Sequence, residues 1–122
     1  MNLGADVDNP RWSASFELVE ESSTYIQYPS NDDYDLALDA AVDREIYEVV
    51  TKCKSGTCTV TIKTDTTALG GTANSASSTQ QVQAHTTSNT WSVDEDLRAT
   101  ISANASCVGL TITCKSRRTI TL

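Results

Sequence analysis

The feature that most constrains the fold is a stretch at residues 66–93 that contains no Asp, Glu, Lys or Arg, with His85 as its only titratable side chain. Thr, Ser, Asn, Gln, Ala and Gly make up nearly all of it, so it has too few large apolar residues to build a core of its own. Alternating runs typical of β-strands flank it, at residues 58–64 and 97–103. We therefore expect surface hairpins and loops of an all-β domain, which form the part that meets other molecules.

Length and charge narrow the class of protein. A chain of 122 residues is one domain's worth. The net charge of −7 argues against nucleic-acid binding and against adhesion to anionic membranes, since both need clustered Lys and Arg. The N-terminal residues lack a signal-peptide pattern, and no apolar run approaches the ~20 residues of a membrane helix. We expect synthesis in a reducing cytoplasm.

Period-two alternation predicts about eight short strands separated by turn residues. A helical turn is allowed around residues 39–44. This spacing of short strands is typical of a single β-sandwich, jelly-roll-like, with an extended N-terminal arm. The expected strands cover residues 12–19, 24–28, 34–38, 45–52, 58–63, 80–86, 97–101, 110–114 and a last run through 120–122.

Alternation also assigns the side chains to faces. A hairpin is expected between residues 45–52 and 58–63, because Gly56 can take a positive φ in the turn. The weaker strand at 80–86 is expected to turn Val82 and Ala84 inward. The predicted single core contains Val60, Ile62, Leu97, Ile101, Leu110 and Ile112.

The four cysteines leave three interpretations open. Their spacing departs from the close C-x₂-C pairs of structural zinc sites, so no metal is expected. A disulfide between Cys53 and Cys58 could span the expected hairpin, although a reducing cytoplasm weighs against it. The favoured interpretation makes Cys58 and Cys114 small core residues, because both are in phase with inward Val, Ile and Leu. The disulfide status of Cys53, Cys58, Cys107 and Cys114 stays open at this stage.

No constellation of catalytic residues is visible, so we expect no enzyme and no cofactor. A general base needs a partner within hydrogen-bond reach, and the polar neighbours of His85 offer none. His85 is therefore expected to be an exposed residue of a polar strand. The serines form no Gly-x-Ser-x-Gly elbow.

Three segments form a distinctive pattern, with Ser-Gly-Thr-Cys-Thr-Val-Thr-Ile at 55–62, Thr-Ala-Leu-Gly-Gly at 67–71 and Ser-Ala-Asn-Ala-Ser at 102–106. Together they resemble a module of tailed-bacteriophage virion proteins of the head-decoration (cement), head-fibre and fibre-tip type. The resemblance covers residues 34–122. Fibre members carry the module after a long shaft, whereas here it follows a short arm.

The resemblance implies a capsid decoration or cement protein that binds the major capsid protein on the outer head surface and stabilises the shell. It also implies a homotrimer. Residues 1–21 would be the arm and residues 22–122 the sandwich domain. The arm would anchor the protein through Trp12, Phe16 and Leu18, since exposed apolar residues often mark partner surfaces. An alternative makes the arm simply the first strand of the sandwich.

The competing class is a receptor- or glycan-binding module of a phage head or tail fibre. Sugar sites favour exposed aromatic residues beside polar ones. His85, Asn89 and Trp91 could supply such a surface, with a host-surface glycan as the ligand. The basic pair Arg117 and Arg118 allows two interpretations, a salt bridge to a partner or charges that protect an edge strand.

Overall fold

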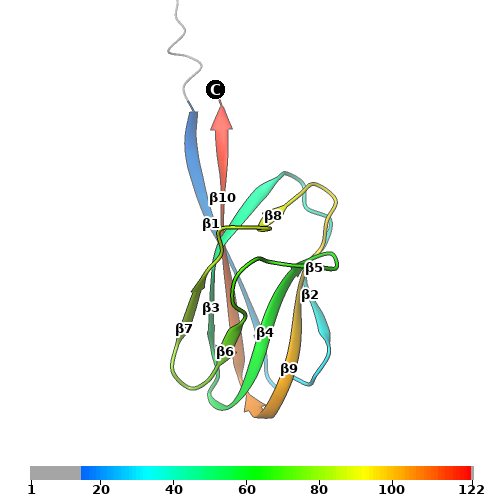
Figure 1. Cartoon of the computed structure of the whole chain (residues 1–122), viewed down its shortest axis with the longest axis vertical. Coiled ribbons are helices and arrows are strands. Elements are labelled where there is room, and N and C mark those ends of the chain that lie inside the picture. The colour runs from blue at the N-terminus through cyan, green and yellow to red at the C-terminus, as the bar shows by residue number, and fades with distance from the viewer. Residues whose placement is uncertain (1–14, 122) are drawn as a thin grey trace, which may run out of the picture.

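The computed structural model describes residues 15–121, and over this range the chain forms ten strands. The strands lie in two antiparallel sheets that face each other (Figure 1). The predicted all-β sandwich is thus confirmed. None of the described residues forms a helix that could cross a lipid bilayer.

Each sheet has a path of four strands with a fifth short strand beside it. The first sheet runs in the order β1 (Ser15–Ile26), β10 (Leu110–Thr121), β3 (Arg44–Lys52) and β7 (Gln81–Ala84), and β8 (Thr90–Trp91) also pairs with β3. The second sheet runs in the order β2 (Asp33–Ala37), β9 (Leu97–Val108), β4 (Ser55–Thr64) and β5 (Thr67–Ala68), and β6 (Asn74–Ala76) also pairs with β4.

The chain changes sheet at most of its connections. β1 and β3 lie in the first sheet, whereas β2 and β4 lie in the second; the last two strands, β9 and β10, are again divided between the sheets. This alternation, with the final strand inserted beside the first, is the topology of a jelly roll. The expected hairpin around Gly56 is therefore wrong, because β3 and β4 belong to different sheets and do not pair.

Gly56 is required for a reason other than the predicted hairpin turn. It lies within β4 at a φ of 75°, where the pairing of β4 with β9 shifts register. A Cβ at this position would lie 2.1 Å from the backbone oxygen of Ser106, which is a distance that no side chain tolerates. Glycine is required here because two backbones approach each other closely at a bulge.

The core lies between the sheets and matches most of the predicted faces. All six predicted core residues are buried, and Leu69, Ala76 and Trp91 of the uncharged stretch join them. Val82 contradicts its prediction, because its side chain is 48% exposed. It pairs with Val50, which faces away from the core, and cross-strand neighbours share a face of the sheet. Ala84 is exposed for the same reason.

The N-terminal strand also differs from the expected division. The two predicted segments at 12–19 and 24–28 contribute to one strand of 12 residues, β1, paired with β10 from Ser15↔Thr121 to Ile26↔Leu110. The predicted boundary between residues 21 and 22 falls inside β1, so residues 15–21 belong to the first sheet. The long partner strand explains this, since β10 offers pairing along the whole of β1. Residues 39–44 include no helical turn, and Asp39 takes a φ of 48°.

Candidate interaction surface on the terminal strands

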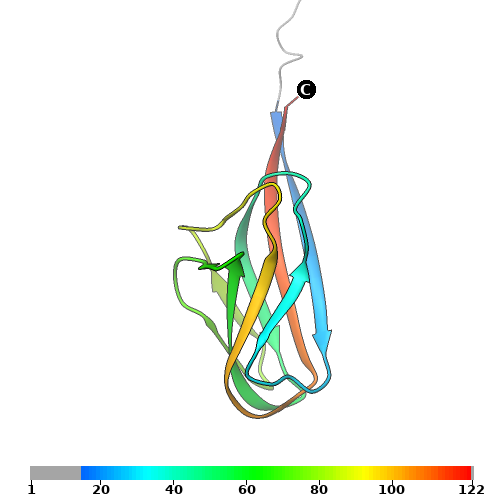
Figure 2. The same ribbon diagram turned by 90° about the vertical axis from the view of Figure 1, so that its right-hand side faces the viewer.

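The paired strands β1 and β10 extend past the rest of the sandwich (Figures 1 and 2). In the body, β10 lies between β1 and β3. Its pairing with β3 ends at Arg117↔Glu45, whereas its pairing with β1 continues to Thr121↔Ser15. Residues 118–121 therefore have only β1 as a sheet partner among the described residues. We call residues 15–18 and 118–121 the terminal ribbon.

One face of the terminal ribbon is apolar apart from Arg118. Side chains alternate along a strand, so Ile120 shares the face of buried Leu110 and Ile112. Phe16 lies opposite Ile120, and Leu18 lies opposite Arg118. Phe16 is 50% exposed, while Leu18 and Ile120 are half-buried. The three residues Phe16, Leu18 and Ile120 form what we call the apolar strip, which continues the core face of the sheet beyond the body.

Charged residues cover the opposite face of these strands in two rows. Arg117 lies 2.9 Å from Glu45 of β3 and 3.9 Å from Glu17 of β1. Lys115 lies 3.0 Å from Glu48 and 4.0 Å from Glu21 in the same way. The hydrogen bond to Glu45 raises the pKa of the Arg117 guanidinium above its ordinary value. Each cation is thus shared between two acids, which makes this a solvated face rather than a site awaiting a charged partner.

A third group of charges lies at the base of the terminal ribbon, on the same face as the apolar strip. The Glu20 carboxylate lies 3.5 Å from Arg44 and 3.8 Å from Arg118. The guanidinium of Arg44 also lies over the ring of Trp91, 5.0 Å from its centroid. These contacts tie β1, β10 and β3 together where the ribbon leaves the body. Arg118 is therefore engaged within the chain, as is Arg117.

The structure brings two of the predicted anchor residues together and adds a third. Phe16 and Leu18 both lie on the apolar strip, whereas Trp12 lies outside the described residues. Ile120 completes the strip but was predicted only as part of the last strand. The alternation of the C-terminal strand was visible in the sequence. That it runs past the covering sheet was not, because the length of one strand relative to its neighbours is a tertiary property.

The three residues predicted for surface recognition are buried instead. His85, Asn89 and Trp91 are 4%, 6% and 6% exposed. Asn89 Nδ2 donates to the backbone oxygens of Ile46 and His85, both at 3.0 Å. The Trp91 indole N–H donates to the backbone oxygen of Glu95 at 2.7 Å. The side chains hold loops to the sandwich, so the predicted exposure of His85 and the predicted recognition surface are wrong.

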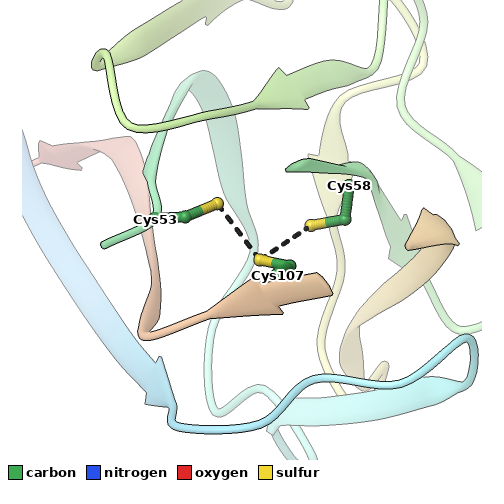
Figure 3. A group of neighbouring side chains, drawn as sticks. All are labelled: Cys53, Cys58 and Cys107. Carbon is green, nitrogen blue, oxygen red and sulfur yellow. Dashed lines mark hydrogen bonds between the residues drawn. The ribbon is translucent and has the colours of Figure 1, made fainter. Parts of the chain in front are cut away.

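All four cysteines are buried free thiols in the structure, and the predicted burial of Cys58 and Cys114 is confirmed. The alternative interpretation, a disulfide between Cys53 and Cys58, is not formed in the structure. Instead Cys53 and Cys58 meet Cys107, which lies far away in the sequence, in one group of three thiols (Figure 3). Cys114 is not part of this group.

Comparison with known proteins gives structural similarities only. No protein-family model matches the chain, and no curated protein matches it significantly. A chain from the cyanophage Pam1 capsid asymmetric unit shares 14% identity, with 96% of this chain and 93% of that chain covered and a TM-score of 0.49. The N-terminal cellulose-binding domain of Cellulomonas fimi β-1,4-glucanase C shares 10% identity, with 83% and 79% covered and a TM-score of 0.42.

A virus-like particle of the Macrobrachium rosenbergii extra small virus contains a further similar chain. It shares 10% identity, with 96% of this chain and 87% of that chain covered, at a TM-score of 0.39. None of these three reaches a TM-score of 0.5, so function is inferred below from the residues of this chain.

Proposed function

We propose that this chain is a structural virion protein, a capsid decoration protein that attaches to the outer surface of a phage head through its terminal ribbon. The observation that carries the proposal is the apolar strip, where Phe16 is half exposed on a ribbon that extends past the body. The sequence resemblance to head-decoration modules supports the same class. Double-sheet jelly rolls occur in capsid and lectin domains, which is consistent with it as a fold-level analogy.

The strip has the properties of an anchor. A two-stranded ribbon is only marginally stable by itself. Here it continues two strands that are fixed in the body by backbone pairing, since β10 pairs with both β1 and β3 there. A rigid aromatic side chain that is presented in this way loses little conformational freedom on binding. Such residues commonly contribute ~2 kcal/mol or more to an interface.

The edge of the first sheet offers a second means of attachment. Among residues 15–121, β1 is the end strand of this sheet and pairs with β10 on one side only. The backbone N–H and C=O groups along its other side can receive a strand from a neighbouring chain. We propose that the major capsid protein contacts the terminal ribbon and that further copies of this chain associate as a homotrimer. The protein would be made in the host cytoplasm and would face outward on the assembled head.

Location and copy number on the particle test this function. The purified chain is added to cognate empty heads that lack it, and the heads are sedimented and imaged by cryo-electron microscopy. Regular density over the capsid lattice, at hundreds of copies for each head, is the expected result. Density at one vertex or on the tail alone would overturn the decoration function, as would a complete lack of co-sedimentation.

The glycan-binding alternative now rests on a different surface from the one predicted. A hollow of about 640 Å³ lies on the first sheet, lined by residues that include Tyr25, Gln80 and Thr111. Tyr25 is 51% exposed, and the ammonium of Lys54 lies 5.6 Å from the centroid of its ring. An exposed aromatic ring beside polar groups suits a sugar face. Binding of a glycan array by the wild-type chain, lost in Tyr25→Ala, would favour this function over decoration.

A further inference from the structure

Three thiols from three different strands or strand ends converge at one end of the sandwich (Figure 3). Cys53 follows β3 in the first sheet, whereas Cys58 in β4 and Cys107 in β9 belong to the second. The Sγ atom of Cys107 lies 3.1 Å from that of Cys53 and 3.6 Å from that of Cys58. Cys107 is therefore the central thiol, and its nearest neighbour directly follows a strand of the opposite sheet.

The surrounding backbone holds these thiols in place. Cys53 N–H donates to the oxygen of Ser77 at 2.7 Å, and Cys107 N–H donates to Asn104 Oδ1 at 3.0 Å. Asn104 in turn donates to the backbone oxygen of Pro29 at 2.8 Å. The backbone takes a positive φ at Ser106, just before Cys107. The convergence of Cys53 and Cys107 is thus a property of a built loop and a bulge rather than of two mobile side chains.

Two of the three thiols border hollows at the surface, and Cys53 is one of them. It lines the hollow on the first sheet together with Lys52, Lys54 and Gly109. Its side chain is 2% exposed in the folded chain, so a reagent needs only a small local movement at the wall of this hollow. Cys58 lines a separate hollow on the second sheet.

The geometry separates a disulfide from a metal site. Two sulfurs that share a tetrahedral zinc, each at ~2.3 Å from it, lie about 3.8 Å apart. Cys53 and Cys107 lie closer together than this. Within the described residues the cluster contains three ligand atoms and no fourth. Three thiolates around a divalent ion would also leave a net negative charge in a buried site, whereas a disulfide is neutral and apolar.

We propose that Cys53 and Cys107 form a disulfide that joins the two sheets when the protein meets an oxidising small-molecule disulfide such as oxidised glutathione. The Cys53 thiolate attacks one sulfur of the reagent and releases the first glutathione thiolate. The Cys107 thiolate then attacks Cys53 Sγ, forms the Cys53–Cys107 bond and releases the second. Two electrons and two protons pass from the protein, and the reagent leaves as two glutathione thiols.

The burial that makes the site suitable for a disulfide also slows its formation. Burial, with a smaller contribution from the hydrogen bond to Cys107, raises the pKa of Cys53 to about 12. Only the thiolate attacks, so we expect the reaction to accelerate about tenfold for each unit of pH through the neutral and mildly alkaline range.

Intact-protein mass spectrometry of the wild-type chain tests the proposal. The reduced protein is incubated anaerobically with millimolar oxidised glutathione in mildly alkaline buffer and is then alkylated under denaturing conditions. We expect the alkylated thiols to fall from four to two, with a loss of two hydrogens and a cross-linked peptide pair that contains Cys53 and Cys107. The disulfide closes the loop of chain between Cys53 and Cys107, which should raise the melting temperature by roughly 10 °C.

Matched variants locate the bond. Cys58→Ala and Cys114→Ala should still lose two thiols, whereas Cys107→Ala should stop at a glutathione adduct or remain unreacted. Circular dichroism of each reduced variant establishes that it is folded. Four free thiols in a folded, oxidant-treated wild-type chain would overturn the proposal, and so would a cross-link between any other pair. Stoichiometric zinc in the protein as purified would overturn it in favour of a metal site.

Discussion

The two halves of β10 have the same alternating pattern, but the inward face of one half is buried in the body and that of the other half is partly exposed. From Thr111 to Arg117 the strand is paired on both sides. The inward-facing residues of this half are buried: Leu110, Ile112, Cys114 and Ser116. From residue 118 to residue 121 the strand is paired only with β1 among the described residues, and Ile120 on the same face is half-buried beside exposed Phe16. The difference lies in what covers the strand, because the second sheet lies over the first half alone (Figure 2).

An apolar alternation thus marks a face to be covered and does not say what covers it. In the body the cover is the second sheet, and the apolar area stabilises the fold. In the terminal ribbon the cover would come from another chain, and the same kind of residue would stabilise an assembly. Equivalent substitutions in the two halves should therefore change different measurable quantities.

The largest difference in the free energy of unfolding should come from truncating one isoleucine in each half of β10. Ile112→Ala removes a fully buried side chain and should lower the free energy of unfolding by about 2–5 kcal/mol. Ile120→Ala removes a half-buried side chain and should cost less than about 1 kcal/mol. Urea unfolding of both variants measures the difference. Equal losses would mean that the terminal ribbon is part of the core.

Alkaline pH should lower the free energy of unfolding, because the body contains buried thiols. Burial raises the pKa of Cys114 from 9.0 to about 12, so the folded state retains a proton that the unfolded state loses. The contribution of this thiol is complete below pH 9 and should decline by about 1.4 kcal/mol for each unit of pH between 9 and 12.

Unfolding of the reduced protein at pH 9 and at about pH 11 measures this slope. Cys114→Ala is the matched control. Its free energy of unfolding should decline less steeply with pH than that of the wild type, by the contribution of one thiol. The terminal ribbon contains no cysteine, so Ile120→Ala should leave the slope unchanged. Identical slopes for the wild type and Cys114→Ala would contradict the burial of this thiol in the folded state.

The smallest effect is expected on the charged face of the terminal ribbon. Glu17 is 58% exposed and lies 3.9 Å from Arg117, which keeps Glu45 as a closer partner. Glu17→Gln should change the free energy of unfolding by no more than ~0.5 kcal/mol, because exposed ion pairs contribute little. A larger loss in the same urea series would contradict this expectation. It would show that the ion pairs, and not the body to which the ribbon is attached, hold the terminal ribbon in place.

The sequence predicted what depends on near neighbours along the chain. Alternation placed Val60, Ile62, Leu97 and Ile112 in the core, and all of them are buried. The same reasoning failed for Val82, whose face is set by pairing with Val50 more than thirty residues away. It also failed for the predicted hairpin around Gly56, because the turn of a hairpin and a connection between two sheets can have the same sequence pattern.

The uncharged stretch misled because its polar side chains were taken to be solvated. Asn74 and Asn89 are buried, and each satisfies backbone oxygens of distant strands; Asn74 Nδ2, for example, donates to the oxygen of Val49 at 3.1 Å. A buried amide that bonds to a backbone far along the chain has no local pattern. The approach of Cys107 to Cys53 across the two sheets is a long-range contact of the same kind.

The most direct test of the account compares the two faces of β1 with one pair of variants. Phe16 and Val19 are each 50% exposed and lie on opposite faces of this strand. Phe16→Ser should melt close to the wild type but fail to co-sediment with cognate empty heads, whereas Val19→Ser should melt and co-sediment like the wild type. If Phe16→Ser remains folded and still decorates the heads as well as Val19→Ser does, the apolar strip is not the attachment surface.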